Sequence, residues 1–164
     1  MTYYFADMSP GQPHPADEVS IDVGAPPERL WALVTDVTQM GRWSPECWKC
    51  TWLDGATGPA VGARFKGHNR RGVIRWSTVS TVVIADAPDH FAFEVDNSGM
   101  RWGYRFERVR DGTRVTEYRQ EVRPKPWWVQ VAYASRVLGR DPDAIVRRGM
   151  AETLARLKAG AQGN

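Results

Sequence analysis

The residues of this sequence best suited to proton transfer are two carboxylates and a phenol: Glu46, Glu117 and Tyr104. A carboxylate that is desolvated among aromatic side chains has a raised pKa, which suits it to exchange a proton near neutral pH. Tyr104 or Asn69 could then hydrogen-bond a substrate carbonyl while enolate character develops on it. No catalytic motif surrounds these residues. The catalytic residues are therefore undetermined, with Glu117, Glu46 and Tyr104 as candidates.

The three histidines are poorly placed for the acid–base role that histidine usually takes in enzymes. His14 lies in the N-terminal segment, His68 falls on the solvent face of a predicted strand, and His90 falls in a predicted turn. The sequence therefore disfavours catalysis by histidine.

The two cysteines of the chain, Cys47 and Cys50, form a C-x-x-C pair. A redox site of this type needs the pair at a helix start beside a β-α-β pattern, and a zinc site needs a second pair of ligands; the sequence offers neither. In an extended strand, residues three apart point to opposite faces, which disfavours a disulfide. We therefore predict two structural thiols, no metal site and no cofactor.

The elements that would position these residues follow an α+β order. Alternating apolar and polar residues predict a first strand over 19–23, and apolar residues at helical spacing predict the helices. Asp141-Pro142 has the residue types of a helix N-cap and first turn. The predicted helices are two short ones over 27–36 and 38–42, one over 127–138, and a long C-terminal helix from Pro142 to about Gly160.

Between these helices, turn signals such as Asp54-Gly55 and Asp111-Gly112 divide the chain into six further strands. Their short connections imply an antiparallel meander. A bent antiparallel sheet with one long helix across it buries one face and can leave a hollow beneath the helix. The six strands are predicted over 47–54, 62–71, 74–86, 90–96, 100–109 and 113–123.

The inner face predicted from strict alternation is rich in aromatic rings and carries several polar atoms. Burying an unpaired amide or carboxylate costs about 1–3 kcal/mol, so these polar atoms indicate a wet cavity or a satisfied network rather than a dry core. In the last strand, Val115 and Glu117 are favoured inward over the alternative of Thr116, Tyr118 and Gln120. The predicted cavity lining is Phe65, Asn69, Trp76, Phe93, Trp102, Tyr104 and Glu117 from the sheet, with Gly149 and Met150 from the helix.

The segment 40–48 packs two tryptophans and a carboxylate around a proline turn. Ligand portals often lie in such loops, so we predict that Trp43, Glu46 and Trp48 contact a ligand at one end of the cavity. The alternative is that the two tryptophans plug the end of the sheet.

Composition and charge narrow the classes of function. The net charge of +3 comes from 22 basic and 19 acidic residues without a long basic run, so no nucleic-acid partner is expected. No apolar run approaches the roughly 20 residues that span a bilayer, and the N-terminus lacks the pattern of a signal peptide. We predict a cytoplasmic protein without a membrane span, with a flexible tail over 1–16 and a single domain over 17–161.

Several motifs carry a family resemblance. They are Ala25-Pro26-Pro27-Glu28-Arg29-Leu30-Trp31, Asp36, Trp43-Ser44-Pro45, Val61-Gly62-Ala63-Arg64-Phe65-Lys66-Gly67, Trp102-Gly103-Tyr104-Arg105-Phe106 and Gly112-Thr113-Arg114-Val115-Thr116-Glu117. In this order and spacing they resemble START-superfamily proteins of the polyketide cyclase/dehydrase and lipid-transport type, also called SRPBCC domains. The likeness spans about residues 18–160.

The resemblance implies a helix-grip (START-like) fold, in which a seven-stranded curved antiparallel sheet wraps around a long C-terminal helix with a deep cavity between them. Members bind lipids, sterols, polyketides or plant-hormone-like aromatics, and some catalyse aldol cyclisation or dehydration. The fold does not fix the function, and no family-wide catalytic set exists to transfer to this chain.

Three functions fit the sequence. Binding of an apolar or aromatic small molecule needs only the cavity and a few polar groups, so it leads. The first alternative is a polyketide cyclase or dehydratase that uses Glu117 or Glu46 as acid and base. The second is a surface interaction module through Trp127-Trp128, which could form a lid, a membrane-touching tip or a homodimer contact. The favoured interpretation of these two tryptophans is that they cap the open end of the core.

Overall fold

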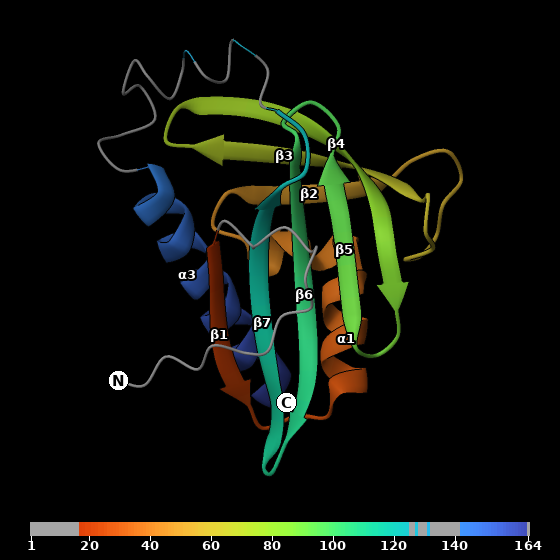
Figure 1. The fold of residues 1–164 in the computed structure, drawn as a ribbon, viewed down its shortest axis with the longest axis vertical. Helices are drawn as coiled ribbons and strands as arrows, with labels where there is room; N and C mark the ends of the chain where they lie inside the picture. The colour runs from red at the N-terminus through yellow and green to blue at the C-terminus, as the bar shows by residue number, and fades with distance from the viewer. Residues whose placement is uncertain (1–16, 125–126, 128–130, 132–141, 164) are drawn as a thin grey trace.

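The computed structural model of the chain describes residues 17–124, 127, 131 and 142–163. Its strands form one antiparallel sheet in the order β1-β7-β6-β5-β4-β3-β2. The sheet is strongly bent, because β2, β3 and the first part of β4 run across the direction of β1, β7 and β6 (Figure 1). The strands are β1 (Asp17–Val23), β2 (Cys47–Trp52), β3 (Arg64–Arg71), β4 (Ile74–Asp86), β5 (His90–Val95), β6 (Met100–Val109) and β7 (Gly112–Glu121).

Helices α1 (Pro27–Thr35) and α3 (Pro142–Gln162) lie on one side of the sheet, behind it in Figure 1. The 3-10 helix η1 (Val37–Arg42) follows α1 and begins after Asp36, whose carboxylate accepts a hydrogen bond from the Thr38 backbone N–H at 3.2 Å. The α+β helix-grip architecture predicted from the sequence is therefore confirmed, with its seven-stranded antiparallel sheet and C-terminal helix.

The dry part of the core lies between α1, the second half of α3 and the sheet. Leu30 of α1 and Leu157 of α3 are fully buried and belong to one cluster with Phe91 and Phe106. The Trp31 ring meets both phenylalanines edge-on, with ring centroids 6.0 and 6.2 Å apart. Burying each such apolar side chain is worth about 1.5–3 kcal/mol, so this end of the core holds the helices on the sheet.

In the last strand, β7, the structure has the register that the sequence analysis favoured, with Val115 and Glu117 inward. Tyr104 of β6 pairs with Glu117 of β7, and both side chains point to the helix side of the sheet, as does the buried Val115. Tyr118 points to the outer face instead, where its ring lies over Gly103. A Cβ at Gly103 would stand 2.3 Å from that ring, so the glycine makes room for it.

A β-bulge in β2 overturns the prediction that Cys47 and Cys50 point to opposite faces of the sheet. Cys47 and Lys49 pair with consecutive residues of β3, so Trp48 is an extra residue in β2. The extra residue shifts the alternation by one, and Cys47 and Cys50 are therefore both buried on the inner face instead of pointing to opposite faces. Trp48 turns outward, is 47% exposed, and its ring centroid lies 5.7 Å from that of His68.

Several predictions fall on residues outside the described part of the chain. These are the flexible tail over 1–16, Trp128, the Asp141 cap and most of the helix over 127–138. Trp127 is described and is 75% exposed, so a surface contact through this region stays a prediction. Within the described residues, no helix has the length and apolar character needed to cross a membrane.

Candidate functional site

A cavity of about 320 Å³ lies between the inner face of the sheet and the first half of α3. On one side the cavity is lined by residues of α3 that follow one another at helical spacing. Gly149 leaves room there because it has no side chain. Ten of the twelve residues predicted to bind a ligand line this cavity: Glu46, Phe65, Asn69, Trp76, Phe93, Trp102, Tyr104, Glu117, Gly149 and Met150.

The other two predicted ligand contacts, Trp43 and Trp48, are not part of the cavity wall. Trp43 is 4% exposed and packs in the core cluster, with the Arg42 guanidinium 5.5 Å from its ring centroid. It therefore plugs the end of the core, as the alternative interpretation has it. Trp48 lies outside because the β-bulge turns its side chain to the outer face.

The polar centre of the cavity is the pair formed by Glu117 and Tyr104. The Tyr104 hydroxyl donates a hydrogen bond to Glu117 Oε1 at 2.9 Å, and the two residues are direct cross-strand neighbours. Glu117 Oε2 is buried and has no hydrogen-bond partner among the described residues. A buried polar atom without a partner is costly, so this oxygen is a natural anchor for a polar group that enters the cavity.

Burial decides the protonation state of both groups. It raises the pKa of Glu117 to about 8, against the opposing effect of the hydrogen bond from Tyr104. Burial also raises the pKa of the Tyr104 phenol well above its usual value, and the neighbouring Glu117 carboxylate raises it further. At neutral pH the cavity therefore holds an uncharged acid beside an uncharged phenol, and Glu117 can act as a hydrogen-bond donor.

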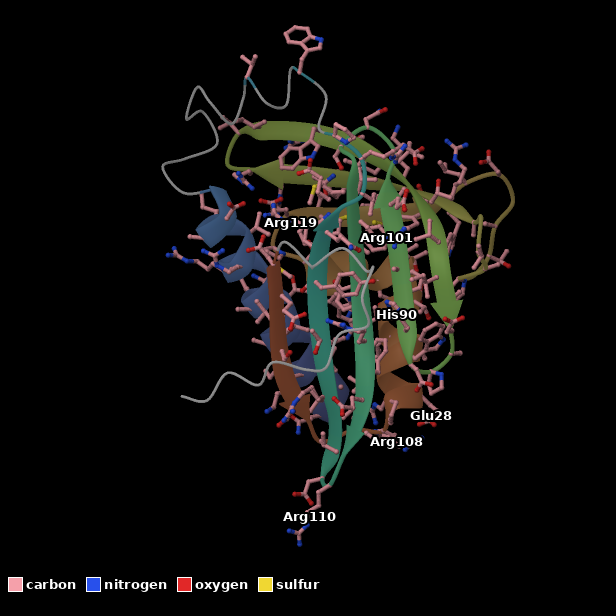
Figure 2. All side chains as sticks on the ribbon, viewed as in Figure 1. Glu28, His90, Arg101, Arg108, Arg110 and Arg119 are labelled. Carbon is pink, nitrogen blue, oxygen red and sulfur yellow. The ribbon has the colours of Figure 1, made fainter. Side chains whose placement is uncertain are left out.

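Arg119 lies two residues after Glu117 on the inner face of β7 and forms ion pairs with carboxylates. Its guanidinium pairs with the buried Asp17 and, at 2.7 Å, with Asp143 in the first turn of α3. Arg147 also reaches Asp17, at 2.8 Å. These pairs tie the start of α3 to β1 and β7, and Figure 2 shows Arg119 at the end of the sheet where α3 begins.

The rim of the cavity carries a second ion pair. The Glu46 carboxylate accepts a hydrogen bond from Arg71 Nε at 2.8 Å, and both side chains are about two-fifths exposed. Deeper in the wall, the Asn69 amide donates to the Thr78 hydroxyl at 3.3 Å. Glu46 is thus engaged by a cation at the entrance, which leaves Glu117 as the acid of the cavity interior.

The two histidines of the described residues stand away from the cavity. His90 begins β5 instead of lying in the predicted turn, and its Nε2 is 2.7 Å from the Tyr118 hydroxyl on the outer face (Figure 2). Burial lowers the pKa of His90, with help from the nearby Arg105 charge. His68 is also outside the wall, beside Trp48.

Some residues of the cavity wall are not in the lining predicted from the sequence. Arg119 shares the inward alternation of Glu117, but nothing in the local sequence signals the ion pairs that accompany its burial. Ile145 follows from helical spacing with Gly149 and could have been predicted. The cysteines depend on the bulge, which local sequence does not reveal.

One known protein family matches most of the chain. The family described as polyketide cyclase / dehydrase and lipid transport matches residues 17–162. No curated protein matches the chain.

Solved structures give the same result. The Polyketide_cyc-like protein Cgl2372 from Corynebacterium glutamicum is 29% identical over 89% of this chain and 93% of that protein, with a TM-score of 0.57. Protein CV1439 from Chromobacterium violaceum is 14% identical over 90% and 98%, with a TM-score of 0.66. Protein Ms6760 from Mycobacterium smegmatis is 18% identical over 87% of each chain, with a TM-score of 0.60. The last two likenesses concern the fold alone.

Proposed function

This chain belongs to the polyketide cyclase/dehydrase and lipid-transport family, and on that premise we propose that its cavity binds an apolar or aromatic small molecule of the lipid, sterol or polyketide class. One observation carries the proposal: Glu117 Oε2, which has no hydrogen-bond partner in the part of the chain that the structure describes, is buried in a wall that is otherwise rich in aromatic rings. A ligand that supplies a partner for this oxygen removes the cost of leaving it unsatisfied.

The size and chemistry of the cavity support a ligand with one polar end. Its volume of about 320 Å³ falls at the lower end of the range of roughly 300–1,000 Å³ for small-molecule sites. Phe65 and Phe93 meet edge-on in its wall, with ring centroids 5.0 Å apart, and offer flat surfaces to an apolar body. The protonated Glu117 favours a carbonyl or hydroxyl oxygen on the ligand as its hydrogen-bond acceptor.

The first experiment is to extract the purified protein with organic solvent and identify what co-purifies by mass spectrometry. A thermal-shift screen with fatty acids, sterols and aromatic polyketides then ranks the ligand classes. We expect stabilisation by at least one class and a reduced shift for Glu117→Leu, which removes the polar anchor. Glu107→Gln alters an exposed carboxylate on the same sheet and is the matched control. Equal shifts for wild type and Glu117→Leu would contradict the assigned anchor.

The Glu117–Tyr104 pair also favours a second candidate, a cyclase or dehydratase reaction. An acid with a pKa of about 8 can donate and take up a proton near neutral pH, and the Tyr104 hydroxyl lies 2.9 Å from its other oxygen. Glu117→Gln keeps the shape and hydrogen-bonding capacity of the side chain but removes the titrating proton. We expect this variant to bind the identified ligand and to lose any turnover of it. Unchanged turnover would exclude Glu117 as the catalytic acid.

A further inference from the structure

The two thiols of β2 stand side by side because of the β-bulge. Cys47 pairs with Asn69 and Cys50 with Gly67, and these two partners are only two residues apart on β3. A strand rises about 3.3–3.4 Å per residue, so the Cα atoms of the cysteines are about 6.7 Å apart instead of the roughly 10 Å of a regular strand. This spacing lies at the upper limit of the range that a disulfide spans.

The sulfur atoms are closer than the backbone spacing requires. Cys47 Sγ lies 3.2 Å from Cys50 Sγ, and Cys50 Sγ lies 3.8 Å from the Met40 sulfur. Both cysteines are free thiols in the structure. A disulfide has a sulfur–sulfur distance of about 2.05 Å, so the two side chains need to move together by little more than 1 Å.

Both thiols are reached from the cavity although they are shielded from the outside. Cys47 and Cys50 are 5% and 3% exposed, and both belong to the cavity wall. Gly67 of β3 lies beside them, and a Cβ at this glycine would stand 3.6 Å from each Sγ. Because Gly67 has no side chain, a small molecule inside the cavity can approach the sulfur atoms.

We propose that Cys47 and Cys50 form a reversible dithiol–disulfide site in the cavity wall, which small hydroperoxides oxidise. The sulfur of Cys47 attacks the outer peroxide oxygen and the O–O bond breaks. The departing oxygen takes up the proton that Cys47 releases and leaves as the alcohol or water, and Cys47 becomes a sulfenic acid. The sulfur of Cys50 then attacks Cys47 Sγ, the S–S bond forms, and the hydroxyl leaves with the thiol proton as water. The two sulfurs give up two electrons in total, which reduce one peroxide.

The close contact of the two sulfurs, 3.2 Å apart, supports Cys47 as the first thiol to react. The hydrogen bond with Cys50 lowers the pKa of Cys47 and outweighs the opposing effect of burial, with smaller help from the backbone at Lys49 and His68. The same bond and burial raise the pKa of Cys50. Cys47 is therefore the thiol that carries the negative charge first, and the thiolate is the form that reacts with peroxides.

Intact mass spectrometry of the reduced full-length protein, treated with one to a few equivalents of hydrogen peroxide, tests the proposal. We expect a loss of two hydrogens per chain that dithiothreitol reverses. Trypsin cleaves after Lys49, between the two cysteines, so the oxidised protein gives a linked pair of peptides covering residues 43–49 and 50–64. Addition of oxygen without linked peptides, no reaction, or disulfides between two chains would each overturn the proposal.

Three variants assign the roles. Cys50→Ser is expected to stop at an oxygen adduct on Cys47, and Cys47→Ser to react at least tenfold more slowly than wild type. Gly67→Ala places a methyl group over both sulfurs and is expected to slow disulfide formation several-fold while leaving the linked peptides unchanged. Equal rates for Cys47→Ser and wild type would reverse the order of the steps, and equal rates for Gly67→Ala would exclude entry through the cavity. The site depends on the cavity geometry and not on the ligand, so these results are independent of the proposed function.

Discussion

The two ends of the space enclosed by the sheet and α3 share β5, β6 and β7 but are filled differently. At the end near α1, Leu30, Phe91 and Leu157 are fully buried and pack with one another in a dry core. At the end near the start of α3, Gly149 and the aromatic rings of β5 and β6 leave a cavity of about 320 Å³ that holds Glu117.

The dense packing at one end and the cavity at the other show how one fold can combine stability with a binding site. Large aliphatic side chains on α1 and the second half of α3 fill the closed end, and they supply the packing energy. The open end lacks these large aliphatic side chains and is stabilised by ion pairs instead. Arg119 of the sheet pairs with Asp143 at the start of α3. Substitutions at matched positions of the two ends therefore test whether one end is dry and the other hollow.

The largest effect is expected within β5, where Phe91 belongs to the closed end and Phe93 to the cavity wall. Phe91→Ala should lower the free energy of unfolding by about 3–5 kcal/mol, because it opens a new void in a packed core. Phe93→Ala only enlarges an existing space and should cost at least about 1 kcal/mol less. Urea unfolding of both variants measures the difference, and equal losses would contradict the division into a dry and a hollow end.

The next effect concerns the ion pairs that hold the open end. Asp17→Ala removes the buried carboxylate that pairs with Arg119, and removing one partner of a buried pair costs about 3 kcal/mol or more. Asp22→Ala is the control on the same strand, because its pair with Arg114 is about half exposed and should cost less than about 1 kcal/mol. Urea unfolding measures both. Similar losses would show that the cluster at the open end does not anchor α3.

A pH effect should distinguish the open end through Glu117. Its pKa is about 8 in the folded chain and 4.5 as a free side chain, so between these values the folded state holds a proton that the unfolded state has lost. The stability that this proton contributes is complete below pH 4.5 and is lost as the pH rises toward 8. Relative to Glu117→Gln, wild type should lose up to about 1.4 kcal/mol of unfolding free energy per pH unit in this window. Parallel curves for the two proteins would mean that Glu117 is ionised in the fold.

The smallest effect is expected at Trp48, which the bulge places outside the cavity. Trp48→Ala should change the unfolding free energy by less than about 1 kcal/mol and leave ligand binding unaltered. Trp102→Ala removes a ring from the cavity wall and should weaken binding. Titration of both variants with the identified ligand compares them, and weaker binding in Trp48→Ala would place part of the site on the outer face.

The alternation of apolar and polar residues predicted which side chains line the cavity wherever a strand has one polar face. In β3 the charged residues mark the solvent side, so Phe65 and Asn69 were placed correctly in the wall. The alternation was ambiguous in β7, because both faces of this strand are buried. On the outer face, Tyr118 fills the space over Gly103.

Two features were beyond the reach of local patterns. The bulge at Trp48 depends on how β2 pairs with β3, and this pairing is a property of the sheet and not of the segment. The burial of Arg119 depends on Asp17 and Asp143, which are distant in sequence. The local sequence therefore does not predict that Arg119 is buried.

The most direct test of the central claim fills the cavity from the helix. Gly149 faces the cavity, whereas a Cβ at Gly160 of the same helix would meet no atom within 4 Å. Both Gly149→Leu and Gly160→Leu replace a helix glycine with a good helix former, so both should fold. Titration calorimetry with the identified ligand should show that Gly160→Leu binds as wild type does and that Gly149→Leu loses at least tenfold in affinity. Wild-type affinity in Gly149→Leu would contradict binding in this cavity.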